Sequence, residues 1–368
     1  MSDNLNESAA QHPLFKKVEQ VRLRRGKIRD TAINLAHGSG GKAMRDLIDD
    51  IFVNSFDNPI LSQLEDQAIF PLDNLSQFGN KLAFTTDSYV VTPLFFPGSN
   101  IGELAVNGTV NDLAVSGAKP LYLSCSVILE EGFSIETLRE VINSMKETAD
   151  RAGVQIVTGD TKVVHRGAAD KLFINTAGIG IIREGVSISA KNLQPDDVII
   201  VNGYLGDHGT AILIARGELA LETEIKSDCQ ALNGLVDTIL NVCSEVHAMR
   251  DATRGGLATV LNEFAQTSEV GIYLHEKTLP VRDEVTGVCE ILGLDPLYLA
   301  NEGKLVVVVP RSRAEVVLSA MKSHPAGKDA CIIGEVIKSP PGIVLLETGF
   351  GSQRIVDMLV GDQLPRIC

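Results

Sequence analysis

The sequence predicts a two-domain α/β protein of the mixed α+β type, in which strands and helices alternate along the whole chain. Its 368 residues, 44% hydrophobic and 22% charged, are enough for two or three packed cores. A polar stretch at 183–196 interrupts the alternation. We therefore expect an N-terminal domain over 31–184 and a C-terminal domain over 185–356. Residues 1–30 are expected to form a basic, solvated extension, and 357–368 a flexible tail.

Periodicity assigns the elements of the first half. Met44, Leu47, Ile48, Ile51 and Phe52 recur at helical spacing after "HGSGG" and predict an amphipathic helix there. Further on, we expect a strand over 81–91, a helix over 101–116, a strand over 121–129, a helix over 134–152, a strand entering a loop at "VQIVTGDT" and a long strand over 171–182.

The second half begins with a strand at "DVIIVNG". We expect helices from about 208, near 231–249 and after "DATRGG", followed by a strand at "GIYLHE", a helix near 283–293, a strand at "KLVVVVP", a helix near 312–323 and strands near 331–337 and 343–348. No short-period repeat is present.

Composition excludes several classes of protein. A net charge of −14 argues against a nucleic-acid partner. No apolar run reaches the ~18 residues of a membrane span, and no signal-like stretch opens the chain, so we expect a cytoplasmic protein. None of the six cysteines forms a C-x-x-C pair or a zinc cluster. The first five, in apolar contexts, are predicted to be small core residues, whereas Cys368, the last residue, has no use in a core.

Two glycine-rich stretches could cradle phosphate. In "AHGSGGKAM", Gly40 and Gly41 precede a predicted helix and Lys42 could reach an anion, although a mobile turn is an equally good interpretation and the P-loop spacing is absent. In "RDATRGGL", Arg254 and two glycines precede another helix in the same manner.

Carboxylates near predicted strand ends could hold Mg²⁺. They are Asp66, Asp87, Asp112 (beside Asn111) and Asp160. Helix caps and turns are the alternative for each one, but Asp112 interrupts an otherwise apolar face. Thr161 and Lys162 follow Asp160, and the lysine could neutralise phosphate or donate a proton. Asp207 is better explained as a cap, whereas Glu302 in "NEGK" is either a base or a turn residue.

The motifs together resemble the HypE family of hydrogenase maturation factors, within the aminoimidazole ribonucleotide synthetase-like ATP-binding superfamily. The matching stretches include "LAHGSGGKAM", "TTDSYVVTPLFFPG", "NGTVNDLAVSGAKP", "VTGDTKVVHRG", "DATRGGL", "NEGKLV" and the terminal "PRIC", and they span about residues 34–368. The resemblance implies two α/β domains, a homodimer formed through a strand-built barrel of the first domain, and ATP with Mg²⁺ in a nearby cleft.

The activity implied by this resemblance is ATP-dependent dehydration. A carbamoyltransferase partner, HypF, places a carbamoyl group on the terminal cysteine; dehydration gives a thiocyanate, and the cyanide passes to iron held by HypC–HypD for [NiFe]-hydrogenase. On this interpretation Cys368 is the carrier, and Lys162 and Glu302 are the candidates for proton transfer. Nucleotide ligands would be Gly40, Gly41, Lys42, Asn111, Thr161 and Arg254, and metal ligands Asp66, Asp87, Asp112 and Asp160. The alternatives are a small-molecule phosphotransferase of the same superfamily and a non-catalytic scaffold.

Overall fold

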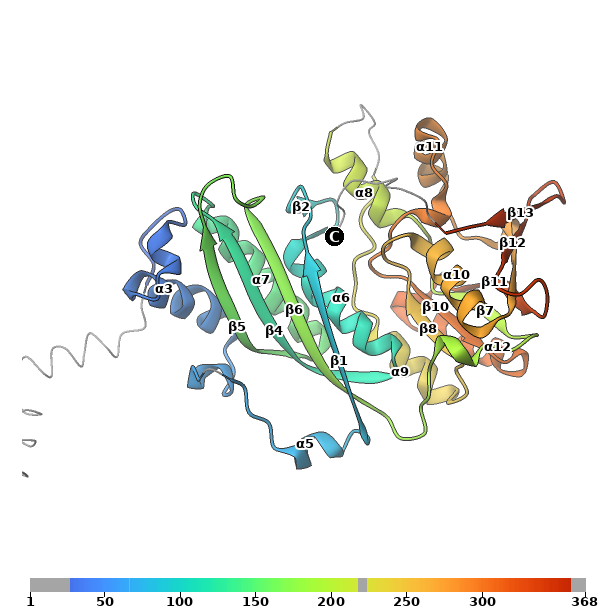
Figure 1. The fold of residues 1–368 in the computed structure, drawn as a ribbon, viewed down its shortest axis with the longest axis horizontal. Coiled ribbons are helices and arrows are strands. Elements are labelled where there is room, and N and C mark those ends of the chain that lie inside the picture. Colours follow the sequence, from blue (N-terminus) through green and yellow to red (C-terminus); the bar gives the residue numbers. More distant parts are fainter. Residues whose placement is uncertain (1–26, 66, 218–223, 359–368) are drawn as a thin grey trace, which may run out of the picture.

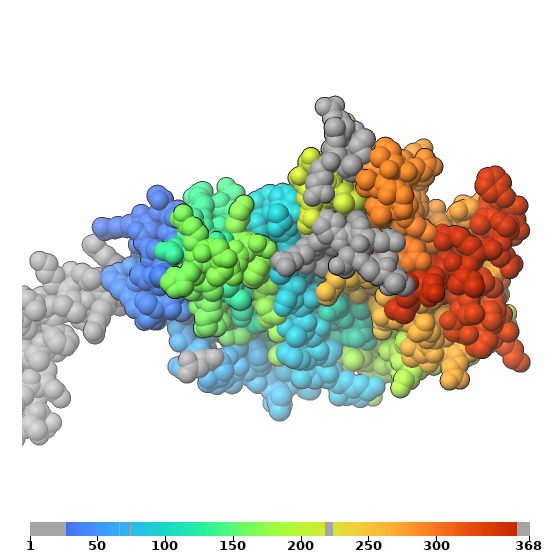
Figure 2. Space-filling model, turned by 45° about the horizontal axis from the view of Figure 1, so that its top comes forward, coloured from blue at the N-terminus to red at the C-terminus, as the bar shows by residue number. Residues whose placement is uncertain are grey.

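The computed structural model describes residues 27–65, 67–217 and 224–358 as two units side by side in an elongated molecule (Figures 1 and 2). The N-terminal unit, residues 27–182, contains η1 (Leu35–Gly38), α3 (Lys42–Leu47), a π-helical turn η2 (Ile48–Val53), α4 (Asn54–Phe56), η3 (Leu61–Gln63), α5 (Leu72–Ser76), β1 (Lys81–Tyr89), β2 (Phe95–Phe96), β3 (Ser99–Asn100), α6 (Ile101–Val115), β4 (Ala118–Glu130), α7 (Ile135–Ala152), β5 (Gln155–Val164) and β6 (Leu172–Ile182).

The C-terminal unit follows from residue 186. It contains η4 (Ala190–Asn192), β7 (Val198–Val201), α8 (Asp207–Ala215), α9 (Asn233–Val242), β8 (Ala248–Asp251), α10 (Gly256–Ser268), β9 (Gly271–His275), η5 (Glu276–Thr278), α11 (Asp283–Leu292), η6 (Pro296–Tyr298), β10 (Leu305–Val309), η7 (Arg311–Arg313), α12 (Ala314–Ser323), η8 (Pro325–Gly327), β11 (Cys331–Ile337), β12 (Val344–Glu347) and β13 (Gln353–Val356). The predicted two-part α/β architecture is confirmed.

Helix α6 is the central element of the molecule. It packs on the sheet β1-β6-β4-β5 and on α7, and its other side contacts β8 and α9 of the C-terminal unit. Nearly all of its residues are therefore buried, which explains a sequence that is apolar or small all round. Gly108 permits this packing, because a Cβ there would lie 2.2 Å from the Tyr89 hydroxyl on β1.

Only one face of the four-stranded sheet is covered by α6 and α7. The opposite face, which we call the open face, presents apolar side chains from paired positions of β1 and β6: Leu82 beside Ile181 and Phe84 beside Ile179. Leu82 is 61% exposed and Phe84 68% exposed. Ile128 of β4 is also exposed on this face. Large apolar side chains this exposed on a sheet face are candidates for an interface.

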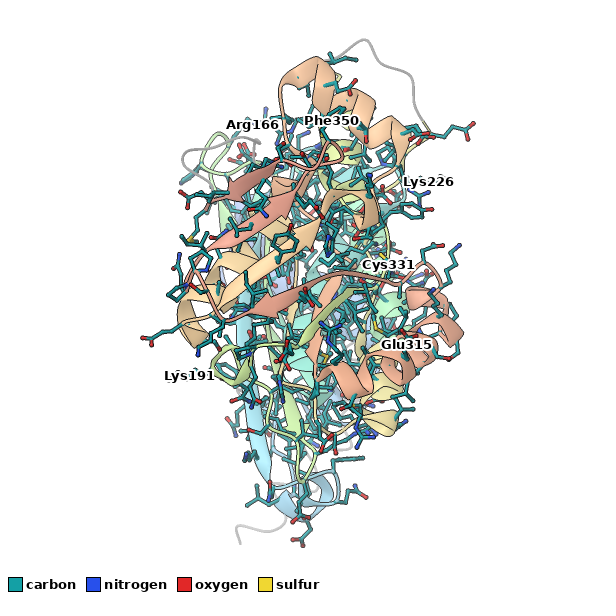
Figure 3. All side chains as sticks on the ribbon, turned by 90° about the vertical axis from the view of Figure 1, so that its right-hand side faces the viewer. Arg166, Lys191, Lys226, Glu315, Cys331 and Phe350 are labelled. Atoms are coloured by element: carbon teal, nitrogen blue, oxygen red, sulfur yellow. The ribbon has the colours of Figure 1, made fainter. Side chains whose placement is uncertain are left out.

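The sheet of the C-terminal unit, by contrast, is covered on both faces. Its order is β13-β12-β9-β11-β7-β10-β8, and every residue of β7 and β10 is buried. Alternate residues of these strands pack against α10 on one face and against α9 and α12 on the other. The hairpin of β12 and β13 forms one edge, with Phe350 fully exposed at its turn (Figure 3).

Two predicted boundaries are wrong, and one strand was not predicted. The helix expected near 231–249 ends at Val242, and 248–251 forms β8, because pairing with β10 prevails over helical periodicity. The loop expected at "GDT" is absent, since β5 continues to Val164 in register with β4. Gly159 allows this close pairing, because a Cβ there would lie 2.0 Å from the Cys125 carbonyl oxygen. Strand β13 was not foreseen.

Among the helices in the described part of the chain, none combines the length and apolar character that crossing a membrane requires. Of the predicted extension, residues 1–26 lie outside the described residues, whereas Ile28 packs against the core of the N-terminal unit. Residues 359–368 of the predicted tail, with Cys368, lie outside them as well.

Candidate active site

A cluster of carboxylates lies where the two units meet. Asp87 on β1 and Asp112 on α6 come from the N-terminal unit, and Asp251 at the end of β8 and Glu302 before β10 come from the C-terminal unit. Their charges influence one another: Asp87 and Asp251 both contribute to the raised pKa of Glu302. Arg254, in the turn before α10, lowers the pKa values of Glu302 and Asp112.

Asp112 and Asp87 are positioned by β1 and α6. The Thr85 hydroxyl donates to Asp112 Oδ2 at 2.8 Å, which shows that this side of β1 faces the helix. Asp87, two residues further along, points to the same side. Burial raises the pKa of Asp112 despite the Thr85 hydrogen bond, and nearby Asp87 adds to the effect. A cation bound between these carboxylates would relieve that repulsion.

Glu302 is the most unusual group in the cluster. It is only 3% exposed, and its Oε1 has no hydrogen-bond partner among the described residues. Burial, followed by the charges of Asp228 and Asp251, raises its pKa well above the usual value. A buried carboxylate with an unused oxygen and a raised pKa is suited to accepting a proton from a bound substrate.

Asp251 was missed by the sequence analysis, which interpreted "RDATRGGL" only for its arginine and glycines. Burial and the neighbouring Asp112 raise its pKa to about 7. The signal that could have identified it is the position of an aspartate at the end of a strand that leads into a glycine-rich turn.

Asn111 lies in the junction, but its side chain contacts protein. Its Nδ2 donates to the carbonyl oxygens of Gln230 at 3.0 Å and Glu302 at 3.3 Å, and its Oδ1 accepts from the Leu232 amide at 2.7 Å. The contacts join α6 to the C-terminal unit. The assignment of Asn111 as a nucleotide ligand stays a prediction.

The remaining candidates form a second group at the other edge of the same sheet. Asp160, Thr161 and Lys162 lie within β5, and the loop carrying Gly40, Gly41 and Lys42 lies next to it, since Gly38 abuts Val163. Lys162 pairs with Asp160 at 2.7 Å and lowers its pKa. Lys42 is exposed and pairs with Asp46 at 2.5 Å.

The two groups are separated within one chain. β1 and β5 are the two edges of the four-stranded sheet, about 14 Å apart at the usual strand spacing. Thr161 is buried on the helix-covered face beside Val127, so the alternating Asp160 and Lys162 belong to the open face. Asp87 and Asp112 lie on the covered side. Asp66, the remaining predicted ligand, lies outside the described residues.

The carboxylate cluster is compatible with an Mg²⁺ ion that is bound partly by protein carboxylates and partly by phosphate oxygens. No group of three or more His, Cys, Asp or Glu side chains in the described ranges has the arrangement of a complete metal site. Mg²⁺ is commonly held by one or two carboxylates, with waters and substrate phosphates completing its shell. Asp87 and Asp112 fit that requirement in ligand type and placement.

The two α/β units, with a carboxylate cluster at their junction, define the AIR synthase-related class of proteins. Residues 64–182 match the family described as "AIR synthase related protein, N-terminal domain", and residues 194–347 match its C-terminal counterpart. Within this class the chain belongs to the HypE family. It is 55% identical to the carbamoyl dehydratase HypE of Rhodobacter capsulatus over 341 residues, which cover 93% of this chain and 99% of the relative.

Solved structures agree with this placement. A HypE structure in complex with ATP is 48% identical and superimposes with a TM-score of 0.86, covering 91% of this chain and 99% of that one. The structure of a HypE–HypF complex matches at 49% identity with a TM-score of 0.74, covering 85% and 99% of the two chains. The family resemblance inferred from the motifs is thereby confirmed.

Proposed function

We propose that this chain is the ATP-dependent carbamoyl dehydratase of hydrogenase maturation, and that Cys368 carries the group it acts on. HypF is the proposed donor of the carbamoyl group, and a HypC–HypD complex the proposed acceptor of the cyanide. The observation that supports the reaction most directly is the buried Glu302 carboxylate at the junction of the two units, whose Oε1 has no hydrogen-bond partner in the described part of the chain.

The chemistry requires a leaving group and a base. Dehydration of S–C(=O)–NH₂ to S–C≡N removes one oxygen and two N–H protons. ATP supplies a phosphoryl group that makes the carbamoyl oxygen a phosphate leaving group, and Mg²⁺ would neutralise charge on the phosphates. Asp87 and Asp112 would hold the cation. One N–H proton would leave to solvent when the carbamoyl oxygen is phosphorylated, and Glu302 would accept the second as the C–O bond breaks and phosphate departs. Arg254 would offset phosphate charge.

A homodimer is part of this proposal. Leu82, Phe84 and Ile128 are exposed apolar side chains on the open face, and a second copy would cover them with the same surface. The second group of predicted site residues, Lys162 and the loop of Lys42, could then approach the carboxylate cluster of the partner. Lys162 would act there on phosphate or on the transferred proton, a role that the sequence analysis left open between Lys162 and Glu302.

The reaction is tested by incubating the chain with a HypF carbamoyltransferase, carbamoyl phosphate and Mg-ATP and following the C-terminal peptide by mass spectrometry. We expect a carbamoyl adduct that loses one water. ATP consumption that is unaffected by removal of residues 359–368 would instead favour a small-molecule phosphotransferase, and no ATP consumption at all would favour a scaffold.

Substituting either Asp87 or Asp112 by Ala is expected to abolish detectable Mg-ATP binding while leaving the fold intact. Each change removes a proposed metal ligand without removing a core contact, since both side chains are only partly buried. Calorimetric titration with Mg-ATP measures the effect. Asp150→Ala, an exposed aspartate on α7, is the matched control. Wild-type affinity in the first two variants would contradict the assignment.

Phe84→Asp is expected to convert a dimer into a monomer. The charge would have to be buried against the apolar face of the partner, at a cost of several kcal/mol. Light scattering at micromolar concentration gives the oligomeric state, and Phe350→Asp, at an exposed turn far from the open face, is the control. A wild-type monomer, or a Phe84→Asp dimer, would refute the proposed interface.

A further inference from the structure

The loop that carries Glu302 is fixed by an aspartate that no motif indicated. Asp228, whose side chain is 3% exposed, accepts hydrogen bonds at Oδ1 from the Glu302 amide at 3.0 Å and at Oδ2 from the Gly303 amide at 3.3 Å. Its Oδ2 also pairs with Lys304 Nζ at 2.8 Å. One carboxylate therefore binds three consecutive residues, Glu302 to Lys304.

The segment that contains Asp228 packs tightly against the loop of residues 302–304. A Cβ at position 303 would lie 1.9 Å from the Asp228 carbonyl oxygen, so only glycine fits beneath it. The Gly303 carbonyl oxygen accepts from Asn202 at 3.0 Å and from Gln230 at 3.2 Å. With its backbone held on both sides, the Glu302 loop has one position relative to the segment of Asp228.

That segment is in turn attached to the N-terminal unit. The Ser227 amide donates to the Pro97 carbonyl oxygen at 2.8 Å, and Asn107 of α6 donates to Cys229 Sγ at 3.3 Å. Asp228 thus lies between the element that bears the proposed base and the unit that bears Asp87 and Asp112. A shift of Asp228 would therefore move Glu302 relative to Asp87 and Asp112.

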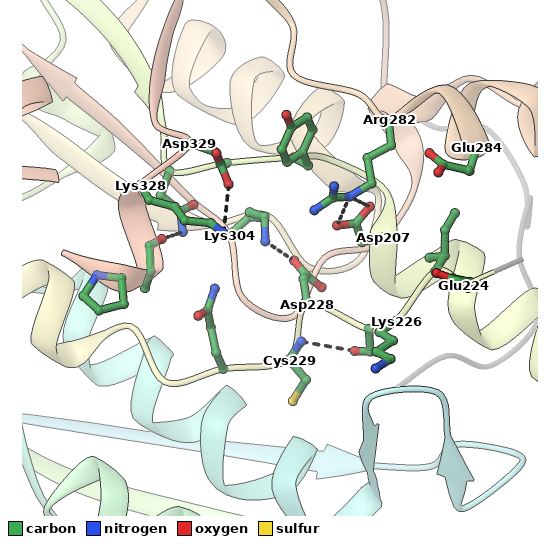
Figure 4. Close-up of a pocket in the computed structure, with 18 residues that line it drawn as sticks. Asp207, Glu224, Lys226, Asp228, Cys229, Arg282, Glu284, Lys304, Lys328 and Asp329 are labelled. Carbon is green, nitrogen blue, oxygen red and sulfur yellow. Dashed lines mark hydrogen bonds and ion pairs between the residues drawn. The ribbon is translucent and has the colours of Figure 1, made fainter. Parts of the chain in front are cut away.

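Asp228 also affects the pKa of Glu302 through its charge. Burial is the main cause of the raised pKa of Glu302. The charges of Asp228, Asp251 and Asp87 raise it further, whereas the charge of Arg254 lowers it. Burial alone would raise the pKa of Asp228. The charge of Lys304 and the hydrogen bond from the Glu302 amide outweigh burial, so the pKa of Asp228 is lowered and Lys304 neutralises its charge. The pair lines a pocket of about 530 Å³ in the C-terminal unit (Figure 4).

We propose that Asp228, paired with Lys304, is the positioning residue that holds Glu302 against the nucleotide ligands of the other unit. This role rests on the proposed dehydratase function, because it assigns a purpose to the fixed position of Glu302. Asp228 itself need not contact the substrate.

Amide hydrogen exchange and turnover on full-length protein test the proposal together. Asp228→Ala is expected to accelerate exchange at the amides of 302 and 303 and to lower kcat about 100-fold, with Mg-ATP affinity within twofold of wild type. Asp197→Asn is the control: Asp197 is a similarly buried aspartate that accepts from the Gln194 amide at 2.8 Å, remote from Glu302 in its contacts. It should leave both readouts unchanged.

A neutral pair, Asp228→Asn with Lys304→Met, covers the case in which Asp228→Ala does not fold. The side-chain oxygen of the introduced asparagine can still accept a hydrogen bond from the Glu302 backbone amide. Protection of that amide from hydrogen exchange, and part of kcat, should therefore return. Asp228→Asn alone, which removes the negative charge and keeps Lys304, should move the acidic limb of the kcat–pH profile to lower pH, which a purely structural role would not cause.

The proposal is overturned if loss of amide protection leaves kcat unchanged, or if Asp228→Asn folds and keeps the wild-type pH profile. Failure of wild-type protein to dehydrate its carbamoyl adduct would instead refute the proposed function. The exchange measurement distinguishes the two cases, because it reports the position of the loop without turnover.

Discussion

Cys368→Ala is expected to show neither a carbamoyl adduct nor a dehydrated product, while binding Mg-ATP with wild-type affinity. The reacting carbon must be attached to sulfur, so no neighbouring side chain can replace the thiol. The proposed metal ligands Asp87 and Asp112 lie on β1 and α6, and the substitution leaves them unchanged. Peptide mass spectrometry after incubation with HypF, carbamoyl phosphate and Mg-ATP gives the first result, and calorimetric titration the second.

The other five cysteines provide the control. Burial raises the pKa of Cys125 and Cys229 to about 12 and that of Cys289 and Cys331 to about 11, and it raises the pKa of Cys243 as well. Their thiolate fractions at neutral pH are therefore very small. Cys331→Ser, at a partly exposed position of β11 (Figure 3), should be carbamoylated and dehydrated normally. An adduct on any of the five would refute the carrier role of Cys368.

Much of the fold and part of the site could be predicted because they depend on local patterns. Helix α6 and the strands around it follow from apolar runs and turn residues. Asp112 could be identified as a candidate because it interrupts an apolar helix. The boundary at 243–248 could not be predicted, since "AMRD" at 248–251 forms a strand only through its pairing with β10.

The grouping of the site residues depends on strand order and on which side each strand turns to the helices. "TTDSY" and "GDTKVV" are similar as motifs, yet β1 presents Asp87 toward α6, whereas β5 presents Asp160 and Lys162 on the open face. Strand order, with β6 and β4 between them, then separates the two by the width of the sheet. Asp228 lies in "KSDCQ", which matches no motif, and only its contacts with residues 302–304 reveal it.

Glu302→Gln is expected to lower the dehydration rate by at least about 100-fold and, at the same time, to stabilise the folded protein at neutral and alkaline pH. The first effect follows because a neutral amide cannot accept the N–H proton. The second follows from the cost of a buried carboxylate. Burial and the charges of Asp228 and Asp251 raise the pKa of Glu302 in the folded protein, whereas the unfolded chain has an ordinary value of about 4.3.

The sign of the pH dependence follows from proton binding. Above about pH 4.3 and below the raised folded pKa, the native state holds a proton on Glu302 that the unfolded chain has lost. Stability therefore falls as pH rises through this window, and Gln, which does not titrate, removes that contribution. The advantage of the variant should be small at pH 5 and larger at pH 8, with the melting temperature rising by roughly 2–4 °C for each kcal/mol gained.

Melting curves and turnover at both pH values decide the outcome, with Glu147→Gln on the exposed side of α7 as the control that should change neither. A Glu302→Gln protein that is less stable than wild type at pH 8 would show that the carboxylate is compensated in the folded chain. A variant that still dehydrates its adduct at the wild-type rate would transfer the role of base to Lys162. Loss of turnover together with a gain in stability is the combination that a buried catalytic base predicts, because the environment that raises its pKa for proton transfer also destabilises the fold.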